Sequence, residues 1–192
     1  RKPCEVILVD DSNPKDQQEI AVLCDRYDAI LEKYTNTVSM KRNHGVTVSR
    51  YDLVLFLDSD CRPVPEILNC HEACYQTEKT GAAAGPLEFV GKENRFWKSV
   101  ILTPYLVCFK MPYWGKTVPW GATANFSVLK KVFEEVGGFS QDFPNKPGGE
   151  DVDLGILITK AGYEISAAPE ALVYHAKETW SQVGPMYKRA WY

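Results

Sequence analysis

Apolar runs and amphipathic stretches alternate along the first 80 residues of the chain. The apolar runs predict three strands, at 5–9, 29–34 and 53–57. Apolar residues at helical spacing predict two helices, over 16–27 and 65–80. Strands that alternate with helices in this way are typical of an α/β fold with a mostly parallel central sheet flanked by helices.

The rest of the chain has a weaker pattern. The elements expected there are a strand over 82–90 that breaks at Gly85-Pro86, helices over 127–136 and 150–161, and strands at 163–167 and 171–175. Residues 36–49 are polar, and we expect them to be irregular. The aromatic residues of 96–120 fit either a core layer or a surface that contacts sugar or lipid. The amphipathic tail, 180–192, could pack as a final helix or lie on the inner face of a membrane.

Length and composition narrow the class of protein. The chain has 192 residues, enough for one domain with a sizeable core. Its net charge of −3 argues against a general nucleic-acid binder. No apolar run reaches membrane-spanning length, and the first residues do not resemble a signal peptide. The six cysteines show no repeated Cys-x-x-Cys spacing, so we expect reduced thiols in a cytoplasmic protein.

Paired acids follow the strand predicted at 53–57. Asp58 and Asp60, separated by one serine, come directly after its last apolar residue. The carboxyl ends of strands form the edge at which open α/β sheets bind ligands. Two close carboxylates repel each other, and a divalent ion that prefers oxygen ligands is the simplest compensation. The alternative is a solvated turn, in which aspartate is common.

Further motifs occur in a fixed order around these acids. They are Val9-Asp10-Asp11-Ser12, Arg42-Asn43-His44-Gly45, Phe56-Leu57-Asp58-Ser59-Asp60, Gly121-Ala122-Thr123-Ala124-Asn125 followed by Val136-Gly137-Gly138-Phe139, and Gly149-Glu150-Asp151-Val152-Asp153-Leu154. Each motif is weak alone, but the ordered set resembles the family 2 glycosyltransferases of the GT-A fold. The resemblance implies one Rossmann-like domain over 1–192, with a nucleotide-binding part at about 1–90 and an acceptor-binding part at about 91–192.

The resemblance also implies an activity. It is the transfer of a sugar from a nucleotide-sugar donor, such as a UDP-sugar, to a glycan, lipid or protein acceptor, with inversion at the anomeric carbon. A divalent ion, Mn²⁺ or Mg²⁺, would stabilise the diphosphate leaving group. Asp60 is the expected direct metal ligand, and Asp58 is expected to help through water or through the donor's ribose. His175 is either a further ligand or a histidine that is hydrogen-bonded at a strand end.

The same resemblance assigns the remaining site residues. Asp151 is the expected general base and Glu150 supports it. The alternative is that these acids only complement the dipole of the helix they begin. Asp11, with Asp10 beside it, is expected to bind the nucleobase, and Arg42 to contact the donor. The acceptor side is expected to include Trp120, Gly121 and Asn125.

The start of the chain departs from the family's pattern. The family normally begins with a strand that ends in Pro-x-Tyr/Phe-Asn, before the strand that carries Asp10 and Asp11. Nothing before Glu5 can supply that strand. We therefore expect a fragment of a domain, with weakened stability and nucleotide affinity.

Two other interpretations stay open. A response-regulator receiver domain also has acids after its first strand, here Asp10 and Asp11, and a phosphorylatable aspartate after a later strand, here Asp58. Lys110 lies near the distance expected for the lysine of such a domain, but residues 120–192 stay unexplained. The other interpretation is a catalytically silent nucleotide-sugar-binding module of the same fold.

Overall fold

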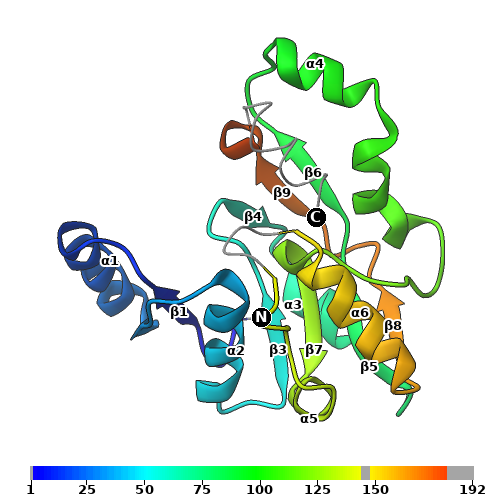
Figure 1. Ribbon diagram of the computed structural model, residues 1–192, viewed down its shortest axis with the longest axis horizontal. Helices are drawn as coiled ribbons and strands as arrows, with labels where there is room; N and C mark the ends of the chain where they lie inside the picture. Colours follow the sequence, from blue (N-terminus) through cyan, green and yellow to red (C-terminus); the bar gives the residue numbers. More distant parts are fainter. Residues whose placement is uncertain (1, 144–147, 181–192) are drawn as a thin grey trace.

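The computed structural model describes residues 2–143 and 148–180 (Figure 1). Its strands are β1 (Ile7–Asp10), β2 (Ile30–Lys33), β3 (Leu53–Phe56), β4 (Cys61–Pro63), β5 (Thr80–Ala84), β6 (Leu87–Val90), β7 (Phe126–Leu129), β8 (Glu164–Ala167) and β9 (Val173–Ala176). Its α-helices are α1 (Pro14–Tyr27), α2 (Val38–Val48), α3 (Ile67–Glu72), α4 (Arg95–Ile101), α5 (Lys130–Glu135) and α6 (Glu150–Lys160). Its 3-10 helices are η1 (Pro104–Tyr113), η2 (Thr123–Asn125) and η3 (Lys177–Trp180). Apart from its first residue, the tail at 180–192 lies outside the described residues.

Within the described residues the strands form three sheets, two of which are mixed in direction. The four-stranded sheet has the order β3-β7-β5-β8, in which β7 runs antiparallel to both of its neighbours and β5 is parallel to β8. In the second sheet β9 lies between an antiparallel β4 and a parallel β6, and β1 pairs with β2 in parallel. The expected α/β fold is confirmed. The expectation of a mostly parallel sheet is wrong, because β7 returns antiparallel between β3 and β5.

The unit of β1, α1 and β2 lies at one end of the molecule (Figure 1, left). Asn13 caps α1, because its side-chain oxygen accepts hydrogen bonds from two N–H groups of the first turn, and Pro14 takes the first helical position. The helix predicted over 16–27 is therefore confirmed and begins slightly earlier. An ion pair between Glu5 and Arg50, 2.8 Å long, links this unit to the residues before β3.

Three predicted local structures are wrong. Residues 36–49 are not irregular, because Thr37 caps helix α2 with its side chain. The helix predicted over 65–80 is reduced to α3, and its last predicted residue, Thr80, belongs to the buried strand β5. The helix predicted over 127–136 is shortened to α5, which begins at Lys130, because Ser127 lies inside β7. Strand pairing decided the last two cases over local propensity, whereas the cap of α2 is itself a local signal.

The hydrophobic core lies on both faces of the four-stranded sheet. Val54 and Phe56 of β3 pack against the cluster that also includes residues of α5 and α6. Leu55, between them, packs against the second cluster, which includes residues of α3 and β6. The apolar run of β3 thus packs against the core on both faces of the sheet.

Two sequence-based expectations concern cysteines and membrane spans. All six cysteines are free thiols. Within the described part of the chain, no helix combines the length and the apolar character needed to cross a bilayer.

Candidate active site

The chain turns sharply after β3, and the turn carries the two acids. The N–H of Cys61 donates to the carbonyl oxygen of Asp58 at 3.1 Å, which closes the turn before β4. Oδ1 of Asp58 lies 3.3 Å from Nη2 of Arg42, whereas Oδ1 of Asp60 lies 3.5 Å from Nε2 of His175. One turn therefore serves two clusters. They are the arginine cluster (Arg42, Asp58, Glu150) and the histidine cluster (Asp60, Cys61, His175).

The pairing of β4 with β9 builds the histidine cluster. Cys61 and His175 are directly opposite each other in this antiparallel pair, so their side chains share one face of the sheet. The N–H of Ala176 donates to the carbonyl oxygen of Asp60 at 3.1 Å and holds Asp60 at the same end of the pair. As a result, one ligand atom from each residue of the cluster lies within 4.8 Å of the other two.

His175 has the ring orientation that is typical of a metal ligand. Its Nδ1 lies 3.1 Å from the carbonyl oxygen of Ala176, and because a carbonyl only accepts, Nδ1 carries the proton. In the neutral ring Nε2 then carries the lone pair and faces the Asp60 carboxylate. Metal-binding histidines commonly donate their other N–H to a backbone carbonyl in this way. The cluster therefore fits a divalent ion held by a carboxylate oxygen and an imidazole nitrogen.

Cys61 adds sulfur to this set of ligand atoms. Burial, together with the charges of Asp58 and Asp60, raises the pKa of the Cys61 thiol to about 12. The thiol is therefore protonated at neutral pH unless a thiophilic cation displaces the proton. This leaves Asp60 and His175 as the first choice of ligands for a hard or borderline ion.

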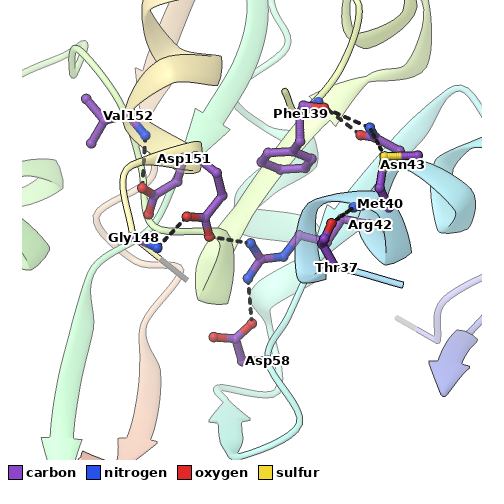
Figure 2. A network of polar contacts seen from close by, with 10 residues as sticks. Thr37, Met40, Arg42, Asn43, Asp58, Phe139, Gly148, Asp151 and Val152 are labelled. Carbon is purple, nitrogen blue, oxygen red and sulfur yellow. Dashed lines mark hydrogen bonds and ion pairs between the residues drawn. The ribbon is translucent and has the colours of Figure 1, made fainter. Parts of the chain in front are cut away.

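The arginine cluster lies between the end of β3 and the start of α6 (Figure 2). Nη1 of Arg42, from α2, donates to Oε1 of Glu150 at 2.7 Å, and Nη2 donates to Oδ1 of Asp58 at 3.3 Å. The side chains of Arg42 and Glu150 are only 13% and 4% exposed, so this ion pair is largely desolvated. The structure thus places Arg42, which the sequence assigned to the donor, between two acids of the protein itself.

Asn43 holds this cluster in place through Phe139. Nδ2 of Asn43 donates to the carbonyl oxygen of Phe139 at 2.8 Å, and its Oδ1 accepts from the Phe139 N–H at 2.9 Å. The Phe139 ring in turn lies against the Arg42 guanidinium, whose carbon is 5.6 Å from the ring centre. Two motifs that are far apart in the sequence therefore meet around one guanidinium.

Asp151 is the second residue of α6 and lies beside the arginine cluster (Figure 2). The helix starts at Gly149 in the left-handed region, with φ of 89°, and the N–H of Val152 donates to Oδ1 of Asp151 at 2.9 Å. Burial and the negative charge of Glu150 raise the pKa of Asp151 from 3.8 to about 6, against the lowering effects of Val152 and Arg42. A carboxylate with this pKa is ionised at neutral pH and is basic enough to accept a proton.

The structure separates the surroundings of Asp10 and Asp11. Asp10 is buried at the end of β1, where its Oδ1 accepts from Oγ of Ser12 at 2.6 Å. Among the described residues, none offers a hydrogen bond to the buried Oδ2 of Asp10. Asp11 instead pairs with Nζ of Lys41 at 2.8 Å. It borders an open groove of about 580 Å³, whose other lining residues are Thr35, Asn36, Thr37, Val38 and Lys41.

Two of the three predicted acceptor residues lie close to α6 or to the four-stranded sheet. A Cβ atom on Gly155 of α6 would overlap Trp120, so the backbone at Trp120 packs directly against the helix that carries Asp151. A Cβ atom on Gly121 would overlap Ala84, which explains why a glycine occupies this position. Trp120 is partly exposed.

Asn125, the third predicted acceptor residue, lies inside the protein. Its exposed fraction is 0%, and its Nδ2 donates to the carbonyl oxygens of Pro86 at 3.0 Å and Ala171 at 2.6 Å. Its Oδ1 lies 2.9 Å from Nε2 of the buried His71. All of these contacts join internal segments, so the structure gives Asn125 a position that differs from the predicted one on the acceptor side.

Sequence reasoning missed Cys61 and Lys41 as residues of the site. Cys61 directly follows Asp60, but only the pairing of β4 with β9 places it opposite His175. Lys41 belongs to α2, a helix that the polar pattern of 36–49 did not predict. Thr37, a good N-cap residue, was the signal that could have revealed this helix.

Solved glycosyltransferases share the fold of this chain. The crystal structure of GalNAc-T7 with UDP, GalNAc and Mn²⁺ is similar with a TM-score of 0.69 and 15% sequence identity, over 92% of this chain and 39% of that chain. The mannosyltransferase PcManGT from Pyrobaculum calidifontis, in complex with GDP-Man and Mn²⁺, is similar with a TM-score of 0.61 and 17% identity, over 89% of this chain and 47% of that chain. The chain thus spans less than half the length of either protein. Its fold is that of the GT-A glycosyltransferases.

A family comparison takes the assignment further. The model of the family described as "Glycosyl transferase family 2" matches residues 1–137, which is most of the chain. The chain belongs to this family of glycosyltransferases. No curated protein sequence matches it at a significant level. The resemblance inferred from the ordered motifs is confirmed.

The receiver-domain interpretation is wrong. The strand that ends before Asp58 has an antiparallel partner, β7, whereas receiver domains are doubly wound around a parallel sheet. The family match also covers Asp10, Asp11 and Asp58, the three acids on which the receiver interpretation depended.

Proposed function

We propose that this chain transfers a sugar from a nucleotide-sugar donor to an acceptor hydroxyl, with a divalent ion and with inversion at the anomeric carbon. The arginine cluster carries this proposal. Arg42 joins Asp58, in the turn that also contains Asp60, to Glu150, the neighbour of Asp151. A candidate base and a candidate metal site are therefore held together by one buried guanidinium.

Asp60 and His175 would hold the divalent ion, with Cys61 beside them. When bound, such an ion supplies positive charge for the diphosphate leaving group. Asp58 is already ion-paired, so its proposed role is to orient the donor through water or the ribose rather than to bind the ion first. Both of the solved structures named above contain Mn²⁺.

Asp151 would act as the general base. It takes the proton of the acceptor hydroxyl while the hydroxyl oxygen forms a bond to the anomeric carbon from the face opposite the leaving group. The bond from that carbon to the nucleoside diphosphate breaks, its electron pair stays on the diphosphate, and the configuration inverts. The hydrogen bond from Val152 fixes the Asp151 carboxylate in one orientation for this step.

The proposed donor is a UDP-sugar. Asp11 borders the groove at the ends of β1 and β2, and Asp10 has a buried carboxylate oxygen that is without a hydrogen-bond donor in the described part of the chain. A nucleobase with a ring N–H, such as uracil, supplies such a donor. The partly exposed Trp120 next to α6 offers an aromatic face for a glycan, lipid or protein acceptor.

Isothermal titration calorimetry with UDP and GDP, each with and without Mn²⁺, tests the donor and the metal site. Asp60→Ala should lower the Mn²⁺-dependent affinity for UDP by about a hundredfold. Asp52→Ala, which removes an exposed acid at the other end of β3, should leave this affinity unchanged. Binding without any dependence on Mn²⁺ would contradict the metal site, and tighter binding of GDP would contradict the choice of UDP.

Slow hydrolysis of a UDP-sugar tests catalysis and its stereochemistry, because water can take the place of the acceptor. Proton NMR identifies the anomer that is released first. An inverted anomer supports the proposal, and a retained one overturns the inverting mechanism. Tight donor binding with no turnover, even with added acceptors, would instead support the catalytically silent module.

A further inference from the structure

We infer that residues 92–116 dock this domain onto the surface of an anionic lipid bilayer. This stretch contains α4 and η1, and we refer to it as the basic apolar segment. Its helix α4 lies at the opposite end of the molecule from α5, beyond the sheet of β6 and β9 (Figure 1, top), and the chain that follows α4 runs down one side of the molecule. The inference does not depend on the proposed transfer reaction.

The basic apolar segment exposes several large apolar side chains. Leu102 is 87% exposed, Trp114 is 63% exposed and Ile101 is 51% exposed. Val107 and Tyr113 are exposed as well. A single exposed apolar residue is ordinary, but this concentration within residues 101–114 is typical of an interaction surface.

The inner side of α4 is fixed to the body of the protein. Trp97 and Val100 are buried, and the Trp97 indole N–H donates to the carbonyl oxygen of Lys177 at 2.9 Å. Arg95, Lys98 and Leu102 follow one another at helical spacing on the exposed side. Basic and apolar groups are therefore presented together by a helix that is held in place from behind.

The charge of the segment favours an anionic partner. All five of its basic residues are exposed, and they are Lys92, Arg95, Lys98, Lys110 and Lys116. Its one acidic residue, Glu93, lies 3.3 Å from Nζ of Lys177. The segment thus has a net charge of +4, while the rest of the chain carries −7, which gives the −3 of the whole chain. Basic clusters of this size are attracted to anionic lipid surfaces.

The kinds of residue in the segment favour a bilayer over an acidic protein. Lysine side chains can extend their charged ends toward headgroups while their stems lie along apolar surface. Tyr113 and Trp114, placed between Lys110 and Lys116, are residue types that are enriched at membrane–water interfaces. Side chains of the segment also line a groove of about 420 Å³, in which Ile101, Leu106, Val107 and Lys110 lie with Trp97 and Lys177 and with one acid, Glu88.

A second exposed apolar patch lies on α1 and gives a natural comparison. Val22 is 66% exposed, and Tyr27 is 68% exposed. Residues 15–28 contain four acids and two bases, so this patch has a net charge of −2. An anionic bilayer would repel it. Apolar exposure alone therefore does not distinguish the two patches, whereas charge does.

Co-sedimentation of the full chain with vesicles tests the inference. We expect binding to vesicles of equimolar phosphatidylcholine and phosphatidylglycerol, and much weaker binding to phosphatidylcholine alone. Added salt should weaken the binding to the anionic vesicles. Lys98→Glu/Lys110→Glu should lower the partition coefficient by roughly tenfold or more. Ile101→Ser/Leu102→Ser should lower it by a similar factor, because both side chains are exposed in the unbound protein.

Matched variants separate a local effect from a general one. Lys131→Glu/Lys160→Glu changes the net charge by the same amount at exposed positions of α5 and α6, and Val22→Ser/Tyr27→Ser removes apolar surface from α1. Both controls should bind vesicles like the unchanged chain, and circular dichroism should show that every variant is folded. The inference is overturned if the unchanged chain binds no vesicles. It is also overturned if the variants and their controls lose vesicle binding equally. A variant that changes the oligomeric state but not vesicle binding would overturn it as well.

Discussion

Asp58 and Asp60 are separated by one residue in the same turn, but they belong to two clusters that balance negative charge differently. In the arginine cluster the cation is part of the chain, because Arg42 contacts both Asp58 and the buried Glu150. In the histidine cluster the atoms brought together are those that bind cations: a carboxylate oxygen, an imidazole nitrogen and a thiol sulfur. The first cluster is complete within the protein, and the second is suited to an exchangeable ion.

This difference separates two tasks of the proposed reaction. A guanidinium that is always charged keeps the turn after β3 attached to the start of α6 and acts constantly on the pKa of Asp151. An exchangeable ion, in contrast, would be present only when the donor's diphosphate and the ligands bind it together. In the proposed reaction, the position of the base would thus be built into the fold, whereas stabilisation of the leaving group would depend on binding of the ion.

Asp151→Asn should give the largest difference between the roles of the arginine cluster and the histidine cluster. The change should lower the rate of donor turnover by about a thousandfold, because asparagine cannot accept the acceptor's proton. Calorimetry should find the Mn²⁺-dependent affinity for UDP unchanged, since the histidine cluster is intact. The rate of the unchanged chain should rise with pH through about 6, as Asp151 becomes ionised. A variant that keeps its rate would remove Asp151 from the mechanism.

Arg42→Met tests whether the fixed cation is needed for the fold. Glu150, with a 4% exposed side chain, would keep a buried charge without its guanidinium. The free energy of unfolding, measured with urea, should therefore fall by about 3 kcal/mol. The double variant Arg42→Met/Glu150→Gln should recover part of this loss. Lys41→Met should change stability far less, because its partner Asp11 has a 37% exposed side chain and would be solvated without the lysine.

The pH dependence of stability provides a smaller test of the same cluster. The pKa of Asp151 is raised in the folded state, so folding favours its protonated form, and this contribution is lost as the pH rises from about 4 through about 6. Asp151→Asn should therefore stabilise the protein by about 2 kcal/mol at pH 8 and by almost nothing near pH 4. Urea unfolding at both pH values measures the difference. Asp25→Asn, at an exposed position of α1, serves as the control. An equal pH effect on its stability would mean that the raised pKa of Asp151 does not cause the difference.

Cys61→Ser gives the smallest expected effect and probes the exchangeable cluster. The pKa of the thiol is raised to about 12, so Mn²⁺ affinity should change by less than about twofold. Zn²⁺, which binds thiolates well, should lose more affinity than Mn²⁺. Titration of both ions into the two proteins measures this contrast. A large loss of Mn²⁺ affinity would mean that Cys61 is a main ligand rather than a neighbour of Asp60 and His175.

Interactions between residues that are close in the sequence determined much of this protein. The alternation of apolar runs with polar turns predicted, to within about a residue, where β1, β2 and β3 end, and therefore that Asp10, Asp11, Asp58 and Asp60 lie at or just after strand ends. The acids and the glycine that begin α6 predicted that helix and the place of Asp151. These inferences held because turns, caps and helical periodicity depend on interactions within a few residues.

Only the tertiary structure decided how these pieces meet. The antiparallel return of β7, the position of Cys61 opposite His175 and the burial of Asn125 all depend on pairings between distant segments. The same holds for the contact of Arg42 with Glu150, which lies 108 residues further along the chain. Such contacts leave no local periodicity in the sequence, because each residue's own neighbours are compatible with several partners. Burial of the whole core selects among them.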